Sequence, residues 1–254
     1  MLSTLGTTLA LFFLIWIASL VFRDASIVDR FWGVAFLVIA SATSAASEGF
    51  EARARLVLLL TAVWGLRLSL HITVRNLGAP EDYRYQAMRR HWGAMFPLVS
   101  LVTVFGLQAL LAWIVSLPIQ GAISAVFPAR LTVLDKLGLA IWIAGFLFEA
   151  VGDWQLARFT ADPRHRGKLM DRGLWRYTRH PNYFGDAVQW WGLWLFAAAT
   201  GAWWTAVGPA LMTFLLVRVS GVALLEKRLQ KTRPEYEAYC RRTSAFVPMR
   251  PRKG

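Results

Sequence analysis

The stretch FPLVSLVTVFGLQALLAWIVSLPI, residues 96–119, contains no charged side chain over 24 residues. About 20 apolar residues are enough for a helix to cross the roughly 30 Å hydrocarbon core of a bilayer. A second uncharged run of 18 residues, LGTTLALFFLIWIASLVF, covers residues 5–22. The whole chain is 56% hydrophobic and only 17% charged, whereas a soluble domain carries about 25% charged residues. These features predict a polytopic, all-α membrane protein.

Working outward from residues 96–119, apolar runs predict seven transmembrane helices. Their approximate ranges are 5–22, 31–47, 55–74, 94–117, 135–157, 184–200 and 202–224. The first run has no basic segment before it and no small-residue cleavage site after it, so we interpret it as a retained helix rather than a signal peptide. Because no internal repeat or low-complexity linker interrupts the chain, we expect a single membrane domain over residues 1–254.

The basic residues alternate between the connections that join these ranges. Of the 28 Lys and Arg residues, 22 fall in alternate connections and in the C-terminal tail. The positive-inside rule therefore predicts an external N-terminus and a cytoplasmic C-terminus. Topology and attraction to anionic lipid account for much of the net charge of +13, so we expect no nucleic-acid partner. Seven basic residues between positions 158 and 179 exceed what orientation requires, and they indicate an anionic ligand as well.

Ionisable side chains inside predicted spans are costly, so each is a candidate functional residue. In the third span Trp64, Arg67, His71 and Arg75 form one polar stripe at helical spacing. This stripe either lines a cavity or makes hydrogen bonds between helices.

Acidic residues near the cytoplasmic ends of later spans allow two interpretations. Glu149 and Asp153 lie one helical turn apart near the end of the fifth span. They either pair structurally with an arginine, Arg67 or Arg158, or accept hydrogen bonds from a ligand. The same two interpretations apply to Asp186 at the start of the sixth span.

Two cytoplasmic connections are also rich in polar groups. In RDASIVDRFWG, residues 23–33, Asp29 either caps the following helix or lines the mouth of a cavity. In APEDYRYQAMRRHWG, residues 79–93, positions 81–85 combine two acids, two tyrosines and an arginine. Together these clusters predict a cavity that opens to the cytoplasm and takes a large anionic ligand and an apolar partner from the bilayer.

The sequence lacks the motifs of several common nucleotide, metal and catalytic sites. No GxGxxG follows a strand and no Walker A motif occurs, so a nucleotide would bind a non-Rossmann site. Four histidines and one cysteine give no metal-ligand spacing, so we expect no metal, and Cys240 alone excludes an internal disulfide. No Ser-His-Asp arrangement is evident.

Four segments together are similar to bacterial membrane proteins of the DUF1295 type, which resemble steroid 5α-reductases and sterol reductases. The segments are SIVDRFWG (26–33), EDYRY (81–85), RHPNYFGD (179–186) and LLEKRLQKTRPEYEAYCRRTSAFVP (224–248). The resemblance covers nearly the whole chain, although the RHPNYFG core alone is shared with isoprenylcysteine carboxyl methyltransferases. It implies a seven-helix fold in the bacterial inner membrane, with NADPH bound in a cytoplasmic half at about residues 145–254.

The resemblance also implies roles for particular residues. Asp153 stands at the position of a cofactor-binding acid, Lys168 at that of a basic residue near the phosphates, and Glu149 replaces a family Asn. In TRHPNYFG, residues 178–185, Pro181 is expected to open a helix, and Gly185 lets a cofactor or a neighbouring helix approach closely. The residues expected to bind the cofactor are Arg67, Glu149, Asp153, Arg158, Lys168, Arg172, Tyr177, Arg179, His180, Asn182, Tyr183, Asp186, Arg218 and Glu226. Among them, the side chains at 182 and 183 are expected to face the nicotinamide or ribose, and those at 179 and 180 the phosphates.

In steroid 5α-reductases a Glu and a Tyr polarise the keto group of the substrate. At the Tyr position this chain has Trp64, and no Glu is clearly matched between residues 24 and 53. Asp29, His71, Tyr83 and Tyr85 are the candidate replacements.

The predicted function is NADPH-dependent reduction of a conjugated C=C bond in a lipophilic substrate, such as a 3-oxo-Δ4 steroid or another conjugated lipid. The alternatives are an S-adenosylmethionine-dependent lipid methyltransferase and a non-enzymatic lipid-binding or transport bundle. The basic residues between 158 and 179 favour a phosphorylated cofactor. The oligomeric state is left open.

Overall fold

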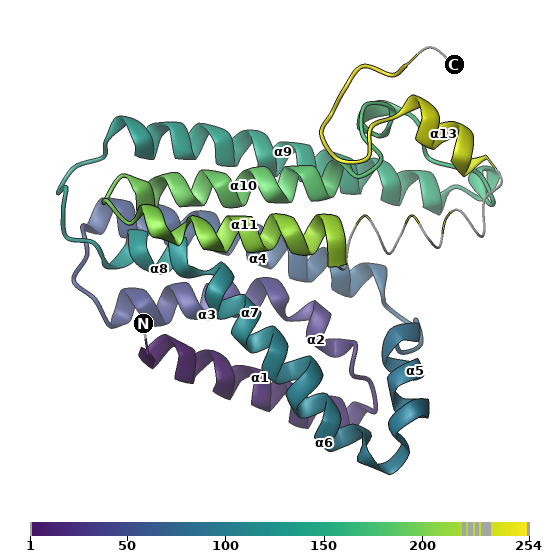
Figure 1. The fold of residues 1–254 in the computed structure, drawn as a ribbon, viewed down its shortest axis with the longest axis horizontal. Helices are drawn as coiled ribbons and strands as arrows, with labels where there is room; N and C mark the ends of the chain where they lie inside the picture. The colour runs from purple at the N-terminus through teal and green to yellow at the C-terminus, as the bar shows by residue number, and fades with distance from the viewer. Residues whose placement is uncertain (1, 220–221, 223–225, 227–228, 230–234, 253–254) are drawn as a thin grey trace. The chain divides into compact units, whose positions relative to one another are not determined.

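The fold was analysed in a computed structural model, which describes residues 2–219, 222, 226, 229 and 235–252 (Figure 1). The described residues form helices and no strand, and Thr178 and Ser244 make one isolated bridge. The all-α prediction is therefore confirmed. Contacts within the chain cluster into two compact units, which are described separately below. The predicted single domain, with its cofactor half, stays a prediction.

The N-terminal unit comprises Met1–Thr132 and Phe196–Thr205. Its helices are α1 (Leu2–Phe22), α2 (Ile27–Arg30), α3 (Trp32–Ala45), α4 (Glu51–Arg75), α5 (Tyr83–Trp92), α6 (Phe96–Ser100), α7 (Leu107–Val115) and α8 (Leu117–Ser124). A 3₁₀ turn, Gly93–Met95, precedes α6, and a π-helical segment, Leu101–Gly106, joins α6 to α7. The uncharged stretch quoted above is therefore one nearly continuous helix up to Val115.

The C-terminal unit comprises Val133–Leu195 and Ala206–Gly254. Its helices are α9 (Val133–Ala161), α10 (Pro181–Ala198, whose last turn belongs to the N-terminal unit), α11 (Val207–Phe214) and α13 (Tyr236–Arg242). Shorter turns are Pro163–His165, Gly173–Arg176 and a π-helical Leu215–Val219; the turn Trp203–Ala206 belongs to the N-terminal unit up to Thr205. Pro181 is the first residue of α10, as predicted, because a proline at that position gives up no hydrogen bond.

Among the described residues, three helical stretches are long and apolar enough to cross a membrane: Leu2–Phe22, Glu51–Arg75 and Tyr83–Val115. Two shorter apolar stretches are Trp32–Ala45 and Trp203–Val219. Each of the seven predicted ranges contains helix, but the fourth begins about ten residues earlier than predicted because α5 precedes it. Part of the seventh range, including residues 220–221 and 223–224, lies outside the described residues. Seven spans and the orientation of the termini stay predictions.

Glycines allow the helices of each unit to approach closely. A Cβ atom on Gly33 of α3 would overlap the carbonyl oxygen of Gly65 on α4. In the C-terminal unit α9 and α10 run side by side (Figure 1), and a Cβ atom on Gly185 would lie 2.6 Å from the Gly145 carbonyl oxygen. Small residues at helix interfaces are typical of membrane bundles, where close backbone packing supplies much of the association energy. Of the two predicted roles for Gly185, the structure shows the approach of a neighbouring helix.

Candidate functional site

A carboxyl group and a phenol meet in the N-terminal unit. Tyr85, on α5, is 6% exposed and its Oη donates a hydrogen bond of 3.1 Å to Asp29 Oδ1, on α2. Arg84 Nη2 lies 3.2 Å from Asp29 Oδ2. Asp82 fixes the start of α5, because its Oδ1 accepts from the Arg84 amide at 2.9 Å and from Arg84 Nε at 2.8 Å. The hydrogen bond between Asp29 and Tyr85 thus joins the connection at residues 23–33 to the connection at residues 79–93.

A chain of hydrogen bonds continues from the phenol into the long helix. Gln108 Nε2, on α7, donates to Tyr85 Oη at 3.3 Å, and Trp32 Nε1 donates to Gln108 Oε1 at 2.5 Å. Gln108 is the only amide side chain within residues 96–119. The Tyr85 phenol oxygen therefore accepts one hydrogen bond from Gln108, and the phenol hydrogen is donated to Asp29.

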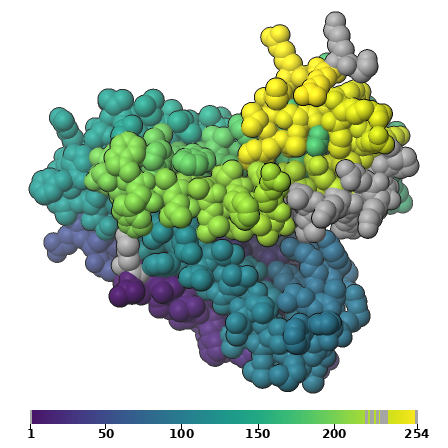
Figure 2. Space-filling model, in the orientation of Figure 1, coloured from purple at the N-terminus to yellow at the C-terminus, as the bar shows by residue number. Residues whose placement is uncertain are grey.

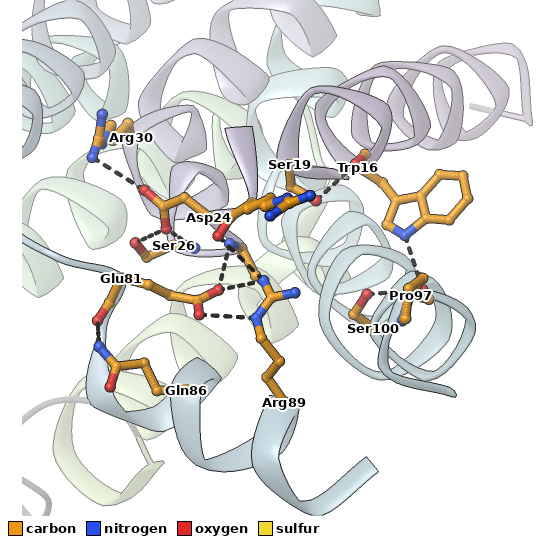
Figure 3. A network of polar contacts seen from close by, with 12 residues as sticks. Trp16, Ser19, Asp24, Ser26, Arg30, Glu81, Gln86, Arg89, Pro97 and Ser100 are labelled. Carbon is orange, nitrogen blue, oxygen red and sulfur yellow. Dashed lines mark hydrogen bonds and ion pairs between the residues drawn. The ribbon is translucent and has the colours of Figure 1, made fainter. Parts of the chain in front are cut away.

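A second set of bonds holds the same two connections together (Figure 3). Glu81 Oε1 accepts from the Ala25 amide and from Arg89 Nη2, both at 2.8 Å. Burial opposes ionisation of Glu81, but the hydrogen bonds from Arg89 and the Ala25 amide hold its pKa below the ordinary value. Asp24 pairs with Arg30 at 3.4 Å. These ion pairs and hydrogen bonds hold the segments that carry Asp29 and Tyr85 together.

The pKa of Asp29 is shifted in the opposite direction to the pKa of Glu81. Burial raises the pKa of its carboxyl above the ordinary value, although Arg84 and the hydrogen bond from Tyr85 act in the opposite direction. Its side chain is still 30% exposed, so a ligand can reach it. The predicted alternative of a helix cap is wrong, because α3 begins after Phe31 without any side-chain cap. An accessible acid with a raised pKa is suited to proton transfer.

The other three predicted catalytic residues lie elsewhere in the N-terminal unit. Trp64 is 1% exposed and its ring packs edge-on against Phe36, at 5.5 Å between centroids. It therefore contributes to the packing of α3 on α4. His71 is half-buried on α4, and Tyr83 is exposed at the start of α5.

In the C-terminal unit Glu149 and Asp153, in the second half of α9, face amides of α10. Asp153 Oδ1 accepts from Asn182 Nδ2 at 2.9 Å, and Glu149 Oε2 accepts from Gln189 Nε2 at 2.5 Å. Both acids are buried. The suggested partner Arg158 instead lies over the Trp154 ring, at 5.6 Å from its centroid. An acid and an amide at the entry of α10 form a polar pair that can bind hydroxyl or amide groups.

The side chains of Arg179 and His180, in RHPNYFG, contact other residues of this protein. Arg179 Nη2 lies 2.7 Å from Glu226 Oε1, and Arg179 also donates to the carbonyls of Cys240 and Thr243. His180 Nε2 lies 3.4 Å from the same Glu226 oxygen, and its ring stacks on Tyr183 at 5.6 Å between centroids. Burial opposes ionisation of Glu226, but the His180 and Arg179 hydrogen bonds hold its pKa below the ordinary value.

Several basic residues of the predicted cofactor set remain exposed. Arg158, Lys168 and Arg172 are exposed and make no ion pair with any described residue, and Tyr177 is exposed as well. Arg218 is exposed at the end of the π-helical turn. The remaining predicted residues are Asp186, buried on α10, and Arg67, half-buried on α4 in the N-terminal unit.

The buried Asp153, the half-buried Asn182 and the exposed cations at 168 and 172 are groups that could bind a phosphorylated dinucleotide. Carboxylates accept hydrogen bonds from ribose hydroxyls, and Lys and Arg bind phosphate oxygens. Asp153 and Asn182 supply the first kind of group. Lys168 and Arg172, which have no ion-pair partner among the described residues, supply the second.

Sequence reasoning missed three side chains. Trp32 and Gln108 complete the hydrogen-bond chain behind Tyr85, and Gln155 Oε1 accepts from the Leu174 amide at 3.0 Å. The signal for Gln108 was present, because a lone amide in an otherwise apolar run needs a polar partner. Neither Trp32 nor Gln155 stands out by spacing or composition.

Comparison with known proteins gives a family but no solved structure that matches the chain. The uncharacterized protein C594.04c of Schizosaccharomyces pombe is 24% identical over an alignment of 274 positions, which covers 92% of this chain and 75% of the yeast protein. The family pattern described as "Protein of unknown function (DUF1295)" matches residues 15–243. This match includes the acid–phenol pair, the α9–α10 polar pairs and the RHPNYFG turn. The chain therefore belongs to the DUF1295 family, which is part of the steroid 5α-reductase-like superfamily.

Proposed function

We propose that this protein is an NADPH-dependent membrane reductase that acts on a conjugated C=C bond in a lipophilic substrate. The observation that carries the proposal is the hydrogen bond between Tyr85 and Asp29, which joins residues 56 positions apart. Superfamily membership supports an enzyme of this class. The Asp–Tyr pair would do here what a Glu and a Tyr do in steroid 5α-reductases.

The pair has the groups that an enone reduction requires. NADPH, when bound, supplies the hydride. Addition to the alkene carbon places negative charge on the conjugated carbonyl oxygen, and a hydrogen-bond donor at that oxygen stabilises it. Tyr85 is the donor in this proposal.

Asp29 controls where the Tyr85 hydrogen points. When Asp29 is ionised, the phenol donates to it, as in the structure. When Asp29 is protonated, which its raised pKa favours, it can donate to Tyr85 Oη together with Gln108. The phenol hydrogen is then free for the substrate carbonyl. The acid also serves as the local proton reservoir.

Different residues of the C-terminal unit would hold the cofactor. We assign Asp153 and Asn182 to ribose or carboxamide groups, and Lys168 and Arg172 to phosphates. Arg179 is better assigned to stability, because its guanidinium already binds Glu226 and two backbone carbonyls. The cofactor, the lipophilic substrate and contact with membrane lipid all belong to this proposal.

The membrane arrangement is part of the same proposal. Seven helices would span the bilayer with the N-terminus outside and the C-terminus in the cytoplasm, because 22 of the 28 basic residues would then face the cytoplasm. The active site would face the cytoplasm of a bacterial inner membrane, where NADPH is available. The substrate would enter from the bilayer.

Binding of NADPH, NADH and S-adenosylmethionine to the detergent-purified protein tests the proposal. We expect NADPH to bind more tightly than the other two, by calorimetry. The variant K168Q/R172Q should lose roughly tenfold in NADPH affinity per lost contact. Its control, R90Q/R130Q, removes two exposed charges of the N-terminal unit and should bind as wild type does. Preferential binding of S-adenosylmethionine would replace the reductase with a methyltransferase.

A further inference from the structure

A basic cavity lies in the C-terminal unit, apart from every residue assigned to the reductase site. Its volume is about 320 Å³. The described residues that line it include five arginines and no acid: Arg179, Arg241, Arg242, Arg250 and Arg252. Thr243 and Ser244 also contribute to it. The C-terminal residues that form most of the lining are yellow in Figure 2.

The charges of this cavity are only partly balanced. Arg179 pairs with Glu226 at 2.7 Å, Arg241 with Glu237 at 2.8 Å, and Arg242 with Asp171 at 3.6 Å. The second and third pairs are largely exposed and contribute little attraction.

The two remaining arginines are uncompensated. Arg250 and Arg252 make no ion pair with any described residue. Two guanidinium groups with no acid, facing one cavity, repel each other unless an anion lies between them.

The Arg179 side chain donates to the carbonyls of Cys240 and Thr243, and the other hydrogen bonds that hold the cavity wall do not use the Arg250 and Arg252 side chains. The Arg252 amide donates to the Arg242 carbonyl at 2.9 Å, and the Met249 amide donates to the Tyr177 carbonyl at 2.9 Å. Thr178 Oγ1 donates to the Phe246 carbonyl at 2.8 Å. Pro248 and Pro251 further restrict this segment. A tail that served only to supply positive charge at a membrane surface would need none of these bonds.

We propose that this cavity binds a phosphate group, held chiefly by Arg250 and Arg252. Arginine binds phosphate through paired N–H donors, which favours it over a simple point charge. The volume is at the small end of the roughly 300–1,000 Å³ of small-molecule sites, so it suits a phosphate-bearing headgroup or a diphosphate rather than a whole dinucleotide. The phosphate comes from a membrane lipid or from a soluble phosphate.

The test uses the full-length protein in a zwitterionic detergent, with two probes. The first is inorganic pyrophosphate, and the second is short-chain phosphatidylglycerol, with short-chain phosphatidylcholine, which is zwitterionic and has no net charge, as its reference. Because a ligand that binds the folded state raises its melting temperature, affinity is read from the shift in Tm with probe concentration. The variants are R250Q/R252Q and the charge-matched control R90Q/R130Q.

We expect at least one anionic probe to raise the Tm of wild type and of the control. Its affinity should fall roughly tenfold or more in R250Q/R252Q, because each lost guanidinium removes a charge-assisted contact. A response to pyrophosphate identifies a soluble phosphate site, and a response to phosphatidylglycerol alone identifies a lipid headgroup. Both side chains are exposed, so the ligand-free Tm should stay unchanged and show that the variant is folded.

Equal responses of R250Q/R252Q and the control to both probes would overturn the proposal, as would the absence of any response in wild type. The probes carry no redox group, so this outcome is independent of the reductase assignment. Failure of the reductase is read separately, from NADPH binding in K168Q/R172Q.

Discussion

The polar clusters around Asp29 and around Arg179 contain similar residues but use their charges differently. In the N-terminal unit Asp29 faces the Tyr85 phenol and Arg84, and its side chain is 30% exposed with a raised pKa. In the C-terminal unit the Arg179 side chain is 10% exposed, and its donors go to Glu226 and to backbone carbonyls. The first cluster keeps an acid with a raised pKa accessible, whereas the second joins parts of the chain that are far apart in sequence. A dense set of polar residues in sequence therefore does not distinguish chemistry from stability.

The largest expected effect is on activity, in D29N. The substitution keeps the shape of the side chain and its ability to accept from Tyr85, but it removes the acid. We expect turnover to fall by about 10²- to 10³-fold. The measurement is NADPH oxidation in the presence of the conjugated lipid that a substrate screen identifies.

A matched control is D162N. Asp162 accepts from the Arg164 amide at 2.9 Å in the same local turn that Asp82 makes, but it lies in the C-terminal unit and outside the proposed site. D162N should keep wild-type turnover. Wild-type turnover in D29N would show that the acid–phenol pair is structural, like the Arg179 cluster.

The second prediction concerns stability, in R179A. Loss of Arg179 leaves the Glu226 carboxylate with a weaker partner and two carbonyls without a donor. We expect a loss of about 3 kcal/mol in the free energy of unfolding, measured as a fall in Tm in detergent. The control R164A breaks an ion pair of the same 2.7 Å length whose arginine is 86% exposed, and we expect no measurable change. If R179A melts as wild type does but loses NADPH binding, the original phosphate-contact assignment is correct.

The third prediction compares glycines in the two units. In G185A and G33A the added methyl group meets backbone atoms of the neighbouring helix. Each should destabilise its unit by about 2 kcal/mol, because a well-packed interface cannot expand without strain. G6A is the control, since no atom lies within 4 Å of a Cβ at Gly6. A normal Tm in both variants would mean that the helix pairs are looser than described.

The smallest effect is the pH dependence of stability, which should differ in sign between the clusters. Asp29 has a folded-state pKa above its ordinary 3.8, so its stabilising contribution grows as pH falls through that folded pKa towards 3.8. Glu226 has a folded-state pKa below its ordinary 4.5, so its contribution is complete above 4.5 and is lost as pH falls through the folded pKa. Each unit of pKa shift is worth about 1.4 kcal/mol.

Melting curves from pH 7 to about pH 3.5 measure this difference. Relative to wild type, the Tm of D29N should fall as pH decreases, and the Tm of E226Q should rise. If the Tm of D29N and the Tm of E226Q changed with pH in the same way, the predicted difference in the pKa shifts of Asp29 and Glu226 would be wrong.

Much of the fold and some of the site were predictable from local patterns. The helix that begins at Pro181, the position of Glu149 and Asp153 on one face of α9 and the apolar helices all follow from spacing and composition. The predicted roles of Trp64 and Asp29 illustrate the limit. Trp64 shares a helical stripe with polar residues but packs against Phe36. The sequence does not distinguish between Asp29 as a helix cap and Asp29 as a cavity residue, because the distinction depends on contacts with Tyr85 and Arg84, which are far away along the chain.

Local patterns along the chain are enough to establish that it is all-α, that it contains helices apolar enough to span a bilayer, and that it belongs to the DUF1295 family. Hydrophobicity and helical periodicity are properties of neighbouring residues, so they are evident without the fold. The contacts of Tyr85 with Asp29 and Gln108, and of Arg179 with Glu226 and the C-terminal backbone, become evident only in the folded protein. These contacts join residues far apart in sequence, and they exist only when packing brings the helices together.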